Sequence, residues 1–282
     1  MAGNRAAVRR VQPSSRVPAR RPIIEVPLED FNESHNILVH SWPGQGKTVF
    51  GAGAPNCSLV SAEPGQISAK RQGSKAGLVK LHDWPMAQDF LAKVESGDFQ
   101  HRDWLVFDTL STLQRKDMND VVDNAHRANP AKIDPDIPAV QHYLKQQNSF
   151  TRWVERMVDA PINCLFLAHT MRIDDQQGDT LYLPSIQGGA DKGYPIANYI
   201  CGLMNAVGYM EMRQIRKSSP DMARRILWQP TEQDGVKYIA KDQYDALGRF
   251  TDDWAMTDVI AAIEGSGSEE KTPKRRTRRT AR

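Results

Sequence analysis

The sequence lacks any run approaching the ~20 apolar residues that a membrane-spanning helix requires, so a membrane partner is not expected. The arginine-rich start of the chain also lacks the apolar segment of a secretory signal. Cysteine is scarce as well: Cys57, Cys164 and Cys201 are scattered, and no Cys-x-x-Cys pair occurs. This spacing excludes a cysteine-based zinc site and predicts free thiols in a reducing cytoplasm.

Acidic residues are absent from both ends of the chain. Residues 1–21 hold six arginines and residues 271–282 hold seven Lys or Arg residues, with no Asp or Glu in either segment. Without these 13 basic residues, the remaining chain has 24 Lys or Arg against 34 Asp or Glu, so its body is acidic. Basic ends on an acidic body favour contact with a polyanion. Disordered ends that only improve solubility are the alternative.

The composition divides the chain into three segments. Residues 1–22 are rich in Arg, Pro, Ala and Ser, which predicts a basic disordered arm. Residues 265–282 join Gly-Ser-Gly-Ser to a Lys/Arg run, which predicts a flexible basic tail. Residues 23–264 are long enough for one large domain, and the 40% hydrophobic content of the chain is ordinary for a globular core.

Short apolar runs alternate with helical patterns along this central domain. We predict strands at 36–40, 58–61, 104–107, 162–168, 199–204, 208–212, 225–228 and 236–240. We predict helices at 48–52, 85–94, 139–158 and 253–263, and a long polar loop at 114–138. Strands that alternate with helices predict an α/β fold, with a mainly parallel sheet flanked by helices.

The segment Ser-Trp-Pro-Gly-Gln-Gly-Lys-Thr, residues 41–48, matches the phosphate-binding signature G-x-x-x-x-G-K-[ST] except at its first glycine. Gly44 and Gly46 would let backbone N–H groups surround phosphates. Lys47 supplies a cation for the phosphates, and the Thr48 hydroxyl is a ligand for Mg²⁺. A strand precedes this segment and a helix follows it, as a P-loop requires. The predicted ATP site consists of Trp42, Pro43, Gly44, Gln45, Gly46, Lys47 and Thr48.

Three further polar residues follow predicted strands. Asp108 fits the acid that holds the metal ion in P-loop enzymes, and a helix N-cap is its alternative role. Glu63, in Ser-Ala-Glu-Pro-Gly, fits a general base that activates water, and an ordinary loop residue is the alternative. His169 could sense the γ-phosphate, or it could be a satisfied histidine at a strand end.

In this order, these motifs resemble those of the RecA-like ATPases, and most closely those of small phage-type AAA-domain or nucleotide-binding proteins, which include single-strand annealing ATPases. The resemblance covers about residues 34–263 and implies a RecA-like P-loop NTPase core. The shared motifs are Pro-Gly-Gln-Gly-Lys-Thr (43–48), Ser-Ala-Glu-Pro-Gly (61–65), Leu-Val-Phe-Asp-Thr-Leu-Ser (105–111), Leu-Ala-His-Thr (167–170) and Ala-Lys-Asp (240–242).

The resemblance also implies a role for each matched residue. Glu63 would be the catalytic glutamate, Asp108 the Walker B acid that places Mg²⁺, and His169 a polar switch before a DNA-binding loop. Lys241 would be a basic finger that reaches the nucleotide of a neighbouring subunit, which implies a homo-oligomeric ring or filament. Relatives commonly have Lys-Asp-Arg at this point, whereas this chain has Gln243, so the finger would be Lys241 alone.

In RecA-like proteins, single-stranded DNA lies against two loops, which correspond here to about 114–138 and 171–190. Neither loop is strongly basic, and the first also contains acidic residues, so solvated loops of mixed charge are the alternative. The basic ends of the chain could supply the missing attraction. The basic residues of the two regions are Arg115, Lys116, His126, Arg127, Lys132, Arg172 and Lys192.

These features predict an ATPase that acts on single-stranded DNA in phage-type recombination, annealing or replication. Replication or recombination proteins would be further partners, in the cytoplasm of a bacterial host if a phage encodes the chain. Two other functions stay open: a motor or loader ATPase that acts on a protein partner, and a nucleotide-dependent switch that does not bind DNA.

Overall fold

A computed structural model describes residues 27, 34–174, 178–188, 195–214, 221–233 and 235–265. The chain divides into two units, residues 1–33 and 34–282, and the elements below all belong to the second. The predicted basic arm, nearly all of the predicted basic tail, and Lys192 lie outside the described residues. The domain boundaries at residues 22 and 265 therefore stay predictions.

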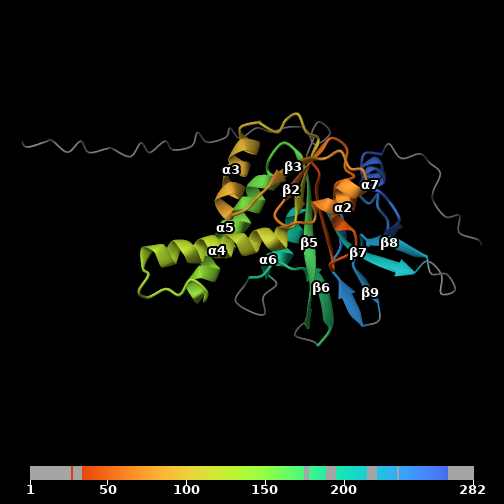
Figure 1. Ribbon diagram of the computed structural model, residues 1–282. Helices are drawn as coiled ribbons and strands as arrows, with labels where there is room; N and C mark the ends of the chain where they lie inside the picture. Colours follow the sequence, from red (N-terminus) through yellow and green to blue (C-terminus); the bar gives the residue numbers. More distant parts are fainter. Residues whose placement is uncertain are drawn as a thin grey trace, which may run out of the picture. The chain divides into compact units, whose positions relative to one another are not determined.

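A mainly parallel sheet forms the centre of the protein (Figure 1). Its strand order is β12-β8-β7-β1-β5-β4-β2-β3. The strands from β7 to β3 in this order run parallel, whereas at one edge β8 pairs antiparallel with β7, and β12 pairs antiparallel with β8. The bounds are β1 (Asn36–Ser41), β2 (Cys57–Ser61), β3 (Gly77–Lys80), β4 (Trp104–Asp108), β5 (Asn163–Asp174), β7 (Ala206–Gln214), β8 (Met222–Leu227) and β12 (Phe250–Asp252).

Strand β5 continues beyond the central sheet and joins a smaller one. From Thr170 onward it pairs antiparallel with β6 (Thr180–Pro184), which in turn pairs with β10 (Val236–Tyr238). Strand β9 (Thr231–Gln233) pairs with β10, and β11 (Lys241–Asp242) pairs with β7. The strand predicted at 162–168 is therefore longer than expected, and His169 lies within it rather than at its end.

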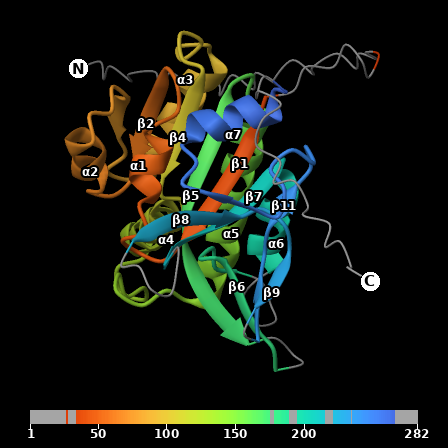
Figure 2. The same cartoon turned by 90° about the vertical axis from the view of Figure 1, so that its right-hand side faces the viewer.

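Helices cover both faces of the central sheet. In strand β1, Leu38 belongs to one buried apolar cluster, and its neighbours Ile37 and Val39 belong to the other. Since successive side chains of a strand point to opposite faces, both faces of the sheet are apolar and both need to be covered. The first cluster includes residues of α3 (Trp84–Glu95), α4 (Leu110–Ala128), α5 (Val140–Val158) and α6 (Pro195–Leu203). The second includes residues of α1 (Lys47–Gly51), α2 (Gln66–Arg71) and α7 (Met256–Ile263), and Figure 2 shows α7 in front of β1. The predicted α/β fold is confirmed.

The predicted polar loop at 114–138 is wrong in its first half, because α4 extends to Ala128. This helix buries residues at a spacing of three to four, as an amphipathic helix does. Three of them, Thr112, Gln114 and Asp117, are polar, so the buried face of the helix does not show an apolar pattern in the sequence. The connection to α5 at Val140 is correspondingly shorter than predicted.

The predicted strand at 199–204 is also wrong, since most of it belongs to α6. Pro195 stands at the start of this helix, where its missing N–H and fixed φ angle are tolerated. Ala197, Ile200 and Cys201 are buried at helical spacing. A short apolar run without polar interruptions fits a buried strand and a buried helix equally well, which explains the error. None of the described helices is long and apolar enough to cross a membrane.

The close approach of α1 to the sheet gives a testable prediction. A Cβ atom at Gly51 would lie 2.7 Å from Val106 Cγ1 and 3.2 Å from Leu167 Cδ1. We expect Gly51→Ala to lower the free energy of unfolding by about 1–3 kcal/mol, because the added methyl group overpacks this contact. Denaturant unfolding measures the change. Gly202→Ala is the control, since a Cβ there meets nothing within 4 Å, and a loss of stability as large as that of Gly51→Ala would contradict the explanation.

Candidate functional site: a P-loop with a glutamate–histidine pair

The P-loop connects the carboxyl end of β1 to α1. Gly44 and Gly46 have φ angles of 82° and 86°, which glycine adopts without the strain of a side chain. The ammonium of Lys47 is buried and donates to the Ser41 carbonyl and hydroxyl oxygens, both at 3.0 Å. Ser41, which replaces the first glycine of the signature, therefore helps to hold the lysine inside the loop.

The middle of the loop is open to solvent, and its flanks contact other strands. Trp42, Pro43 and Gly44 are exposed. The Trp42 ring packs edge-on against Tyr182 of β6, with 5.7 Å between ring centroids. Gln45 Oε1 accepts a hydrogen bond from the backbone N–H of Met212 in β7 at 2.5 Å. The loop thus carries an exposed tip between two anchored sides.

Thr48 and Asp108 form the predicted metal pair. Thr48 Oγ1 donates to Asp108 Oδ2 at 2.8 Å, while Asp108 Oδ1 is buried without a hydrogen-bond partner among the described residues. A Cβ atom at Gly65 would lie 3.1 Å from Thr48 Oγ1 and 3.2 Å from Asp108 Oδ2, so this position leaves room beside the pair. One carboxylate and one hydroxyl fit Mg²⁺, which takes few protein ligands and completes its shell with phosphates and water.

Burial shifts the pKa values of Asp108 and of the neighbouring Lys47. Burial raises the pKa of Asp108 to about 6, an effect that the Thr48 hydrogen bond opposes. Burial also lowers the pKa of Lys47, an effect that the carboxylates of Asp108 and Glu63 oppose. A divalent cation at this pair would favour the ionised carboxylate. The alternative role of Asp108 as a helix N-cap does not apply, because Thr109 is the N-cap of α4.

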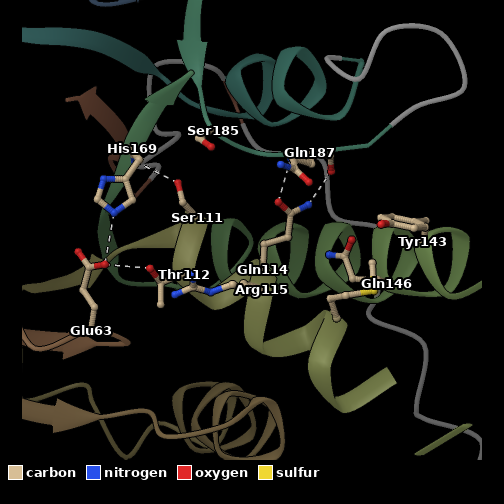
Figure 3. A pocket seen from close by; sticks show the side chains of 11 residues that line it. Glu63, Ser111, Thr112, Gln114, Arg115, Tyr143, Gln146, His169, Ser185 and Gln187 are labelled. Atoms are coloured by element: carbon tan, nitrogen blue, oxygen red, sulfur yellow. Dashed lines mark hydrogen bonds and ion pairs between the residues drawn. The ribbon is translucent and has the colours of Figure 1, made fainter. Parts of the chain in front are cut away.

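Glu63 follows β2 and forms a pair with His169 of β5 (Figure 3). Its Oε2 atom lies 3.3 Å from His169 Nε2 and accepts a hydrogen bond from the Thr112 hydroxyl at 2.8 Å. The hydrogen bond from His169, followed by that from Thr112, holds the pKa of Glu63 below its usual range. Glu63 is therefore an ionised, oriented carboxylate rather than an ordinary loop residue.

The first turn of α4 supplies residues that sequence reasoning missed. Besides Thr112, the Ser111 hydroxyl accepts from the His169 backbone N–H at 3.0 Å. Gln114 forms two hydrogen bonds with the Gln187 backbone, at 2.6 and 2.9 Å. In the sequence, only their position shortly after Asp108 could have indicated that these residues belong to the site, because the helix that carries them was not predicted.

These residues border a pocket of about 390 Å³ that begins at Glu63 and His169 and extends along α4 and α5 (Figure 3). Most of the residues that line it are polar. Besides Glu63 and His169, it is lined by Ser111, Thr112, Gln114, Arg115, Met118, Tyr143, Gln146, Ser185 and Gln187.

Lys241 lies apart from this cluster within one copy of the chain. It pairs with Val207 near the start of β7, and its ammonium donates to the carbonyl oxygens of Gly202 and Met204 at 2.8 and 2.6 Å. These carbonyls lie at the end of α6, near the amino ends of the parallel strands, whereas the P-loop follows the carboxyl end of β1. The predicted role of Lys241 in a neighbouring copy stays a prediction.

The fold and this site define a P-loop nucleotide-binding protein. Residues 34–246 match the family model described as AAA domain, so the chain belongs to the AAA domain family of P-loop ATPases. A search of curated proteins gave no match. Matching solved structures include a KaiC-like protein from the hyperthermophilic archaeon Pyrococcus horikoshii, with 10% sequence identity and a TM-score of 0.37. That match covers 70% of this chain and 80% of the archaeal one.

The raised pKa of Asp108 predicts a conflict between stability and metal binding. Its protonated form contributes stability that is fully present below pH about 4 and is lost as the pH rises through about 6. Without nucleotide and metal, Asp108→Asn should therefore raise the free energy of unfolding by about 1–3 kcal/mol at pH 8 and by little at pH 4. Denaturant unfolding at both pH values measures the difference, with Asp103→Asn on the exposed surface as control. Equal stabilities of wild type and Asp108→Asn at pH 8 would contradict the prediction.

Proposed function

We propose that this protein hydrolyses ATP with Mg²⁺. One observation carries the proposal: an oriented, ionised Glu63 lies beside the Thr48–Asp108 pair and the P-loop lysine. ATP bound by the loop amides and Lys47 would present its γ-phosphate near this carboxylate. Thr48 and Asp108 would hold Mg²⁺, which neutralises charge on the phosphates. Glu63 would orient the attacking water and accept its proton.

His169 would report the state of the nucleotide under this proposal. Its ring contacts Glu63, and its backbone N–H contacts Ser111 at the start of α4. It also stands where β5 passes from the central sheet, opposite Ser41 of the P-loop, into the smaller sheet with β6. A change at Glu63 could thus reach both α4 and β6 through one residue.

Glu63→Gln tests the catalytic assignment. We expect turnover to fall by about 100-fold or more, since an amide cannot accept the proton, while ATP binding persists. Lys47→Ala should reduce both ATP affinity and turnover, because it removes the cation at the phosphates. Steady-state turnover and equilibrium titration with ATP separate these effects. The exposed Glu264→Gln is the matched control, and normal hydrolysis by Glu63→Gln would place the base elsewhere.

We propose further that the ATP cycle is coupled to single-stranded DNA, as the resemblance to RecA-like proteins implies. The pocket beside Glu63 supports this proposal, since it combines an exposed cation, Arg115, with an exposed aromatic ring, Tyr143. Cations attract phosphates and aromatic rings stack on bases. A ring or filament, with Lys241 acting on the neighbouring nucleotide, belongs to the same proposal. Its setting would be phage-type recombination, annealing or replication.

A protein partner is the second candidate, because the start of α5 exposes apolar side chains. Ile137, Val140 and Leu144 have exposed fractions of 67%, 79% and 59%. Exposed apolar side chains that gather in one place are typical of protein interfaces. This surface favours a motor or loader that acts on another protein.

Turnover with and without single-stranded DNA separates the two candidates. We expect DNA to raise turnover and to bind with an affinity that falls as salt increases. Arg115→Gln should weaken DNA binding about 3- to 10-fold and reduce the salt slope by about one, because it removes one phosphate contact. Arg71→Gln, at an exposed position on α2 and outside both candidate DNA-binding loops, is the matched control. Unchanged turnover together with no salt-sensitive binding would exclude the DNA function and favour the protein partner.

A further inference from the structure

The hairpin of β7 and β8 contacts the P-loop from the side of β1 that is opposite to β4 and β2. Gln45 accepts from the Met212 N–H in β7, and Arg224 is the residue of β8 that pairs with Met212. The guanidinium of Arg224 reaches the loop itself: a Cβ atom at Gly46 would lie 3.4 Å from its Nη2 and 3.5 Å from its Nε atom. Consecutive loop residues thus touch both strands of the hairpin.

The guanidinium of Arg224 has no hydrogen-bond partner among the described residues, and its Nε atom is buried. Asp253 is near, but its Oδ1 accepts from the backbone N–H of Arg224 at 2.8 Å, and its own N–H donates to the Arg224 carbonyl at 2.7 Å. These bonds fix the backbone of the arginine, and the Asp253 carboxylate attracts the guanidinium without forming a hydrogen bond to it. Burial lowers the pKa of Arg224, so the fold bears a desolvated cation there.

The adjacent Arg225, unlike Arg224, has hydrogen-bond partners for its guanidinium among the described residues. Arg225 forms two hydrogen bonds with Asp252, at 2.7 and 2.6 Å, and its guanidinium lies 3.9 Å above the centre of the Phe250 ring. Because side chains alternate along a strand, Arg224 and Arg225 face opposite sides of the sheet. Arg225 joins β8 to β12, whereas Arg224 keeps its donors available beside the P-loop.

We infer that Arg224 binds the phosphates of the nucleotide from within the same chain, as a second cation besides Lys47. This inference rests on the proposed nucleotide site and adds a ligand-binding residue to it. A guanidinium offers a planar fork of donors that matches two phosphate oxygens. The bound phosphates would supply the partners that Arg224 lacks.

The sheet order indicates which phosphates Arg224 contacts. Asp108 and Glu63 approach the loop from β4 and β2, on one side of β1, and mark the place of the metal and the γ-phosphate. Arg224 approaches from β8, on the other side. It therefore contacts phosphates that are retained in the diphosphate product. The residue contributes to nucleotide affinity and leaves the rate of the chemical step largely unchanged.

Titration of the purified full chain with ADP and Mg²⁺ tests this inference. We expect Arg224→Gln to weaken MgADP binding about 10- to 100-fold, as the loss of a charge-assisted phosphate contact does, with kcat at saturating ATP within about threefold of wild type. Arg224→Lys keeps the positive charge but loses the planar pair of donors, so its MgADP affinity should lie between those of wild type and Arg224→Gln. Arg225→Gln is the matched control and should leave MgADP affinity unchanged.

Thermal unfolding checks that the variants fold. Arg224→Gln should match or exceed the Tm of wild type without nucleotide, since it removes a half-buried cation whose Nε atom is buried without a hydrogen-bond partner among the described residues, and should lose most of the Tm increase that MgADP produces. If both Arg224 variants bind MgADP as tightly as wild type, the inference about Arg224 is wrong, while the proposed ATPase function is unaffected. A lower kcat with unchanged MgADP affinity also overturns it, because Arg224 would then act on the transition state. A wild-type protein that does not bind MgADP overturns the proposed function and this inference together.

Discussion

The hydrogen bond from Thr48 to Asp108 joins the start of α1 to the end of β4, across 60 residues of sequence. It can form because parallel strands bring their carboxyl ends to the same edge of the sheet. The same constraint brings Glu63 from β2 and His169 from β5 to the P-loop after β1. Strands β1, β2 and β4 are buried on both faces, so a shift in their register would displace apolar side chains as well as the site.

Much of the site was predictable because each residue follows a strand that the sequence marks clearly. The P-loop, Glu63 and Asp108 come directly after short apolar runs, and such runs predict buried parallel strands. The residues that surround them were not predictable in this way. Thr112 and Gln114 lie on α4, where polar side chains such as Asp117 take buried positions and conceal the helical pattern.

Contacts that depend on the pairing of strands distant in the sequence could not be predicted. Arg224 and Arg225 are adjacent and chemically identical, and no local pattern distinguishes the one beside the P-loop from the one that holds Asp252. Only the register of β7 with β8, together with the position of β7 beside β1, separates their roles. The helix α6 was missed for a different reason, since its short apolar run fits a buried strand and a buried helix equally well.

The length of α4 has a mechanical consequence. With 19 residues, it extends about 28 Å from its first turn, which contacts Glu63 and His169 through Thr112 and Ser111. A tilt of about 5° at that turn would move the far end by roughly 2 Å, because a helix transmits motion as a nearly rigid rod. The far end leads to Ile137 and Val140, two of the most exposed apolar side chains. A small tilt of α4 beside the phosphates would thus displace the exposed segment at Ile137 and Val140 far enough to change its contacts with another molecule.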